Sequence, residues 1–105
     1  MKYKYIGTEE QFNERFLDVV YELDNEEERD VLISLCEQMG YNTKYANDTY
    51  SHPFEKTNLW NDVRLYKLQS KFKSLSWRYC DVSKYTPRKL NIQDLIDAKL
   101  VEVIA

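Results

Sequence analysis

Few residues of this chain have the chemistry of a catalytic group, and none has the neighbours that catalysis needs. His52 is the only histidine, and it precedes Pro53 in a turn-prone segment. A histidine acting as a general base needs a nearby nucleophile and an orienting acid, and nothing local completes such a triad. We therefore favour an ordinary loop role for His52 over a catalytic one, and we expect that the chain is not an enzyme.

The two cysteines, Cys36 and Cys80, are far apart in the sequence and form no CxxC pair. Cys80 lies near Arg78 and Lys84, cations that would lower the pKa of a thiol and activate it. A free cysteine more often packs as a small apolar side chain, and we prefer that interpretation for both residues. Free thiols indicate a reducing cytoplasm.

The chain also lacks the patterns of a metal or phosphate site. One histidine and two distant cysteines do not provide the ligand spacing of a zinc site. The acidic run at 26–30 would attract a cation, but such runs more often form the solvated start of a helix. Gly7 and Gly40 are the only glycines, so there is no glycine-rich phosphate loop. We predict no metal and no cofactor.

The most distinctive chemistry lies in residues 63–79, where aromatic and aliphatic side chains interleave with bases and no acid intervenes. Aromatic rings stack on nucleobases, and the bases between them bind phosphates. A nucleic-acid-binding interpretation assigns these contacts to Arg64, Lys67, Lys71, Lys73 and Arg78. A sequence pI near 5.2 counts against it, because such domains are usually basic.

Aromatic residues make up 14% of the chain, and tyrosine and tryptophan are enriched where proteins meet. The irregular segment 46–62 contains several large rings. Such a segment either folds back onto the core or serves as a binding loop. A protein-binding interpretation assigns the contacts to Tyr50, Phe54, Trp60 and Tyr66.

Short-range patterns predict the elements that would position these residues. Two alternating runs around a polar break at 69–71 predict a β-hairpin over 63–79. Short strands are expected at 2–6 and 100–104, with 41–45 as a further candidate. Helical spacing predicts two amphipathic helices or one kinked helix within 8–39, and a short helix over 92–98. The predicted caps are Thr8, Asn25 and Asn91 at helix starts and Gly40 at a helix end.

This order predicts an α+β fold, in which two or three helices pack mainly on one face of a small antiparallel sheet of three to five strands. A length of 105 residues predicts a single domain, 1–105. No apolar run approaches the roughly 20 residues that cross a bilayer, and the N-terminus has no apolar signal region. We expect no membrane partner and a cytoplasmic location.

The charges are segregated along the chain. Residues 8–37 contain eleven acids and two bases, a local charge of −9. Residues 63–90 contain eight bases and one acid, a local charge of +7. This asymmetry either presents a charged face to a partner or is partly cancelled where acidic helices meet basic strands.

Several stretches resemble small proteins that phages and prophages of low-GC Gram-positive bacteria encode. They are the opening MKYKYIGTEEQF, the helix end LCEQMGY, the aromatic-basic hairpin and the closing NIQDLIDAKL. The resemblance covers most of the chain in style and includes no functional motif, so it assigns no binding residue. It implies an accessory factor that inhibits or regulates a host protein or defence system. The two hypotheses are thus a module that binds a host or phage protein and a module that binds nucleic acid.

Overall fold

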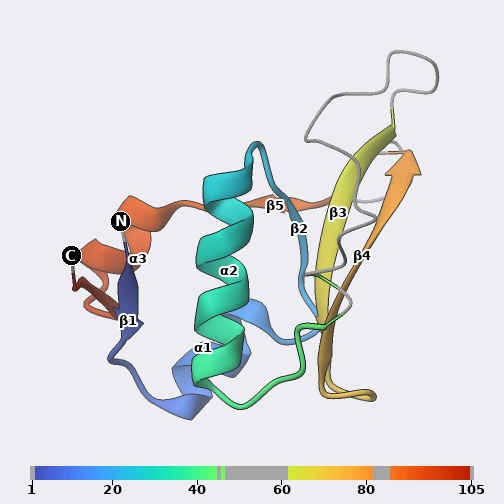
Figure 1. Ribbon diagram of the computed structural model, residues 1–105. Helices are drawn as coiled ribbons and strands as arrows, with labels where there is room; N and C mark the ends of the chain where they lie inside the picture. The colour runs from blue at the N-terminus through green and yellow to red at the C-terminus, as the bar shows by residue number, and fades with distance from the viewer. Residues whose placement is uncertain (1, 45, 47–61, 82–85, 105) are drawn as a thin grey trace.

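The computed structural model describes residues 2–44, 46, 62–81 and 86–104, and the side chains of all these except 62–64 and 77–81. In chain order the elements are β1 (Tyr3–Tyr5), α1 (Glu9–Phe16), β2 (Val20–Glu22), α2 (Glu26–Gln38), β3 (Asp62–Gln69), β4 (Ser74–Asp81), β5 (Arg88–Lys89), α3 (Ile92–Asp97) and β6 (Val101–Val103) (Figure 1). The predicted α+β class is confirmed.

The described strands form two sheets. One pairs β1 with β6, and the other has the order β4-β3-β2-β5. In Figure 1, α1 and α2 lie between β1 on one side and the larger sheet on the other. A single cluster of buried side chains connects the layers, from Tyr3 on β1 through Phe12 and Leu35 on the helices to Leu68 on β3.

The larger sheet departs from the expected antiparallel arrangement. Strands β3 and β4 form the predicted antiparallel hairpin. Strand β2 also pairs with β3 in antiparallel orientation, but β5 pairs with β2 in parallel. The predicted strand at 41–45 is also wrong for its described part, because only Asn42 forms an isolated bridge, with Ser74. Both differences involve pairings with residues that are distant in the sequence, which local patterns do not specify.

Each predicted N-cap is confirmed. The side chains of Thr8, Asn25 and Asn91 accept a hydrogen bond from the backbone N–H three residues later, at 3.2, 2.9 and 3.1 Å. Thr8 also forms the predicted capping box, since its own N–H donates to Gln11 Oε1 at 2.8 Å. These bonds satisfy backbone donors that no helical carbonyl can reach.

Within the helical segment predicted over 8–39, the first helix is short. Helix α1 ends at Phe16, and Asp18 takes a left-handed φ of 59°. Residues Val20–Glu22 then form β2, whose Tyr21 pairs with Tyr66 of β3. The spacing of the apolar residues in this segment fits either a helix or a strand. Pairing with β3 makes it a strand. The alternative of two helices within 8–39 is thus confirmed, but the strand that separates them was not predicted.

The end of α2 matches its prediction. Gly40 has a φ of 85°, and its N–H donates to Glu37 O at 2.9 Å. The N–H of Tyr41 donates to Cys36 O at 3.0 Å, which completes a Schellman motif. The chain thereby reverses and crosses toward the larger sheet.

Candidate protein-interaction surface

The turn between β3 and β4 presents an aromatic ring to solvent. Residues 70–73 connect Gln69 to its cross-strand partner Ser74. Phe72 is 64% exposed, more than any other large hydrophobic residue that the structure describes. The ammonium group of Lys71 lies 5.5 Å from the centroid of this ring, within range of a cation–π contact. We call residues 70–73 the hairpin tip.

Asp18 anchors one side of the hairpin tip. Its Oδ2 accepts a hydrogen bond from the Ser70 hydroxyl at 2.6 Å, and its Oδ1 accepts one from the Ser70 N–H at 3.1 Å. The Asp18 N–H in turn donates to Leu68 O at 2.7 Å. The two bonds from Ser70 lower the pKa of the Asp18 carboxyl, because they stabilise its charged form.

Asn42 anchors the other side. Its N–H donates to Lys73 O at 3.0 Å, and its carbonyl accepts from the Leu75 N–H at 2.8 Å. Lys73 has a left-handed φ of 48°, which closes the turn. The hairpin tip is therefore braced by two segments that are distant in sequence. A braced loop loses little conformational freedom when it binds.

A hollow of about 340 Å³ adjoins the hairpin tip. Its lining combines apolar side chains with one acid and one base, and consists of Glu9, Leu17, Met39, Gly40, Tyr41, Ser70 and Lys73. Tyr41 stacks on Phe12 with ring centroids 5.9 Å apart, and its hydroxyl donates to Asn13 Oδ1 at 3.2 Å. The surface thus offers an exposed ring near a hollow whose lining is partly apolar and partly polar.

Tyr66 was predicted to bind a partner protein, but the structure places it in the core. Tyr66 has 0% exposure and packs in the core, so its side chain is not presented to a partner. It lies on the face of β3 that the helices cover, and a tyrosine on an alternating strand does not reveal which face that will be. The other three predicted residues, Tyr50, Phe54 and Trp60, lie outside the described residues, as does His52.

The predicted nucleic-acid contacts are only partly brought together. Lys71 and Lys73 flank Phe72, and Lys67 is exposed on β3. Arg64 and Arg78 occupy the hairpin strands, but their side chains are outside the described set, as is that of Cys80. Cys36 is fully buried, and burial raises the pKa of its thiol to about 12, with a further contribution from Glu37.

Phe72 is the residue that sequence analysis missed. It lies within the aromatic-basic stretch, but it was not singled out among the rings. The sequence did indicate that this ring is exposed. An aromatic residue between two lysines, next to the polar break between two strands, has no sheet face on which to pack.

The predicted partial cancellation of the segregated charges is seen at β5. Lys89 of β5 lies 2.6 Å from an Asp24 carboxylate oxygen and 3.1 Å from one of Glu22. Partial burial lowers the pKa of Lys89, but the hydrogen bonds to these two acids outweigh it and the pKa is raised. Among the described residues, by contrast, neither Lys71 nor Lys73 forms an ion pair. Charge is therefore cancelled at β5 and left available at the hairpin tip.

Comparisons with known proteins provide no family for this chain. No protein-family model matches it, and neither curated proteins nor solved structures gave a significant match. Within the described ranges, no helix is long and apolar enough to span a bilayer, and no three His, Cys, Asp or Glu side chains converge as metal ligands would.

Proposed function

We propose that this chain is a protein-interaction module that docks on another protein through the hairpin tip, as an inhibitor or regulator of a host protein. The observation that carries the proposal is the 64% exposed ring of Phe72 on a turn braced by Asp18 and Asn42. Aromatic side chains are enriched at protein interfaces, where a few well-packed residues contribute most of the binding energy. The lysines beside it suit the polar rim of such an interface.

The chemistry of the hairpin tip also defines the partner. The ring of Phe72 requires an apolar pocket, and Lys71 and Lys73 favour carboxylates at the margin of that pocket. Burial of the ring would supply affinity, whereas the two lysines would mainly accelerate association and make it depend on salt.

Single-stranded nucleic acid is the second candidate, because Phe72 could stack on a base while Lys71 and Lys73 contact phosphates. Two carboxylates count against it. Glu9 lines the same hollow as Lys73, and Asp18 lies directly beneath Ser70. A phosphate backbone carries a charge at every nucleotide, so a strand that reaches the lysines would also bring phosphates close to both acids. A protein partner can place carboxylates at the lysines alone and present apolar groups elsewhere, so it suits the surface better.

Affinity capture from host lysate tests the proposal with two variants. We expect Phe72→Ser to lose the captured protein, with about 30-fold weaker binding, as for a residue at an interface hot spot. Ile6→Ser is the matched control, because Ile6 is another exposed apolar residue, 45% accessible, and does not line the hollow beside the tip. Unchanged capture by Phe72→Ser would contradict the proposal.

A labelled single-stranded oligonucleotide tests the alternative at low and physiological salt. If the lysines bind phosphates, the affinity falls with a log–log slope of about −0.7 per contact. We expect weak binding that disappears at physiological salt, and protein capture that survives nuclease. Tight binding that persists in salt and is lost in a Lys71→Glu, Lys73→Glu double variant would favour nucleic acid instead.

We also propose that the chain acts by binding alone, without turnover. His52→Ala should then leave both its biological activity and its melting temperature unchanged. Loss of activity at an unchanged melting temperature would make His52 a functional residue and would reopen the question of catalysis.

A further inference from the structure

A groove of about 650 Å³ lies between β1 and α2. It is lined by Lys2, Tyr3, Glu26, Glu27, Asp30, Val31, Ser34, Gln38 and Ile104. These residues belong to the start of β1 and the residue before it, to α2, and to the residue that follows β6. In Figure 1 the starts of β1 and α2 are at the upper left, and the hairpin tip is at the lower right. The groove and the hairpin tip therefore occupy opposite sides of the molecule.

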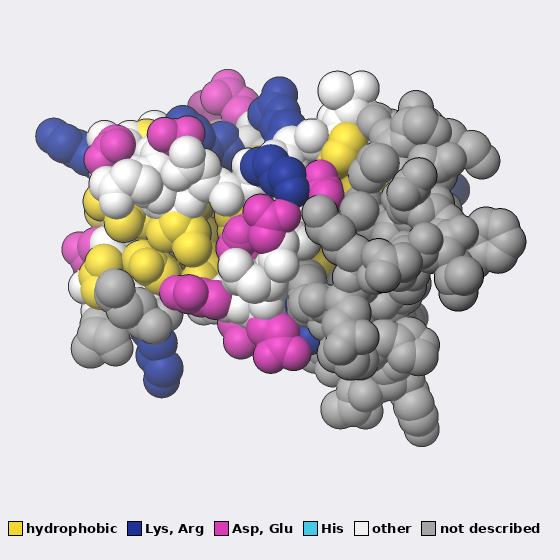
Figure 2. Space-filling view, turned by 90° about the horizontal axis from the view of Figure 1, so that it is seen from above, with side chains coloured by type: hydrophobic (Ala, Val, Ile, Leu, Met, Phe, Trp, Pro, Cys, Tyr) yellow, Lys and Arg dark blue, Asp and Glu magenta, His cyan; other side chains and the backbone are white. Residues whose placement is uncertain are grey.

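The groove has an apolar floor and an acidic rim. Tyr3 and Val31 are 8% and 5% exposed and form its base, and Ile104 remains 49% exposed at its side. Glu26 and Asp30 are four residues apart on α2, so they lie one turn above the other. In Figure 2, hydrophobic side chains gather on the left of this face, with acidic side chains along their border.

The inner end of the groove is closed by Gln38, whose amide satisfies the outer edge of β1. Its Oε1 accepts from the Tyr5 N–H at 2.8 Å, and its Nε2 donates to Tyr3 O at 2.9 Å. These are the backbone groups that an added strand would use. An occupant of the groove is therefore held by buried side chains and by charge, not by strand addition.

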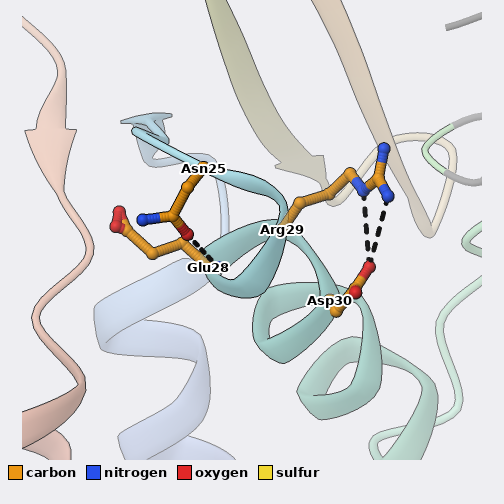
Figure 3. Close-up of polar contacts among 4 residues, drawn as sticks. All are labelled: Asn25, Glu28, Arg29 and Asp30. Carbon is orange, nitrogen blue, oxygen red and sulfur yellow. Dashed lines mark hydrogen bonds and ion pairs between the residues drawn. The ribbon is translucent and has the colours of Figure 1, made fainter. Parts of the chain in front are cut away.

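The acids of the rim, Glu26, Glu27 and Asp30, are exposed. Asp30 Oδ1 accepts hydrogen bonds from Nε and Nη2 of Arg29, both at 3.4 Å, and the Asp30 side chain is still 69% exposed (Figure 3). Lys2 is the single base in the lining, against three carboxylates. A side chain that enters the groove between flanking lysines would meet opposite charge on the α2 side.

We propose that the groove of one copy receives the hairpin tip of a second copy. Phe72 would enter the apolar floor, while Lys71 and Lys73 face Glu26, Glu27 and Asp30. This inference rests on the proposed function, in which the hairpin tip is a docking element, and adds a second copy of the chain to the host protein as a partner of that tip. Because two different surfaces meet, each copy keeps one free tip or groove, and association continues head to tail unless a ring closes.

Analytical ultracentrifugation over a concentration series tests this directly. We expect the average mass of the wild type to rise with concentration and to fall when salt is added, because the contact includes opposite charges. Phe72→Ser removes the aromatic ring from the hairpin tip and should weaken self-association about 30-fold. The Glu27→Lys, Asp30→Lys double variant reverses two charges on the rim of the groove and should also weaken self-association.

Mixing the two variants is the decisive step. The Phe72→Ser protein keeps its groove, and the Glu27→Lys, Asp30→Lys protein keeps its tip. An equimolar mixture should therefore form a one-to-one heterodimer and nothing larger. Ile6→Ser and Glu102→Lys, both at exposed positions that do not line the groove, should associate like the wild type. Melting temperatures establish that each variant is folded.

The outcomes separate this inference from the proposed function. A wild type that stays monomeric at all concentrations overturns the inference, and so does a mixture that forms no heterodimer. If Phe72→Ser still loses a different captured protein, the hairpin tip remains a docking element with another partner. If Phe72→Ser changes neither self-association nor capture, both proposals fail.

Discussion

At the scale of the residue, Asp18 has the widest structural consequences for the candidate surface. It follows Leu17, the C-cap of α1, with a left-handed φ of 59°, and it bonds to Ser70, which is 52 residues further along the chain. One side chain thereby places the hairpin tip relative to the helices. Its lowered pKa indicates that the charged carboxylate is the form that holds Ser70.

This linkage predicts a dependence of stability on pH. A carboxyl whose pKa is lowered by folding stabilises the protein above its unfolded pKa of about 3.9, and that contribution is lost as the pH falls through the folded value. Asp18→Asn keeps a residue type that tolerates positive φ but removes the charge. We expect Asp18→Asn to melt below the wild type at pH 7 and to match it near pH 2.

Thermal melts at four pH values between 7 and 2 measure this difference. Ser70→Ala in both backgrounds is the control, because it removes the hydroxyl that bonds to Asp18. The effect of Asp18→Asn should shrink when Ser70 is already alanine. A wild-type advantage that persists unchanged at pH 2 would contradict the assignment.

At the scale of the element, two helices end in the same motif with different residues. Both α2 and α3 are followed by a residue of positive φ, which is Gly40 after α2 and Lys99 after α3. After α3, the Leu100 N–H donates to Leu95 O at 2.9 Å and the Lys99 N–H donates to Ile96 O at 3.0 Å. The geometry is a Schellman motif in both cases, but a side chain strains the second.

Replacing Lys99 by glycine should therefore stabilise the protein. An L-residue in the left-handed region costs roughly 1–2 kcal/mol, and glycine removes most of that cost. Lys99→Ala is the matched control, since it removes the same charge and keeps the strain. We expect Lys99→Gly to be about 1 kcal/mol more stable than Lys99→Ala in chemical denaturation. Equal stability of the two variants would mean that no strain is stored there.

At the scale of the whole molecule, α2 is the element around which both sheets are organised. Its buried residues are Val31, Leu32, Ile33, Leu35 and Cys36. At about 100° per residue these positions cover roughly 200° of the helix surface, which is wider than the stripe of a helix packed on one side. The arrangement in Figure 1, with β1 on one side and the larger sheet on the other, accounts for that width.

This position predicts large losses of stability for changes on α2. Leu32 and Leu35 are almost completely buried, at 1% and 0% exposure. Leu→Ala at either position should cost roughly 2–5 kcal/mol, because it removes buried apolar surface and leaves a cavity. Ile6→Ala, at an exposed position, should change stability by less than about 0.5 kcal/mol. A near-zero loss at both leucines would place the core elsewhere.

The sequence by itself determined the features whose partners are close along the chain. The N-cap residues Thr8, Asn25 and Asn91 each bond to a backbone N–H three residues later, so the pattern contains the whole interaction. Gly40 ends α2 for an equally local reason, because glycine has no Cβ to oppose positive φ. The alternation of the β3–β4 hairpin and the helical spacing of α2 were visible in the same way.

The tertiary structure alone decided features whose partners are distant. Residues Val20–Glu22 satisfy a helical period, but hydrogen bonds to β3 make them a strand. Tyr66 and Phe72 belong to the same aromatic-basic stretch, yet one is in the core and the other in solvent. The physical reason is that exposure depends on which face of β3 the helices cover and on where the turn projects. Local residue patterns contain neither fact, and so they did not separate the buried Tyr66 from the exposed Phe72.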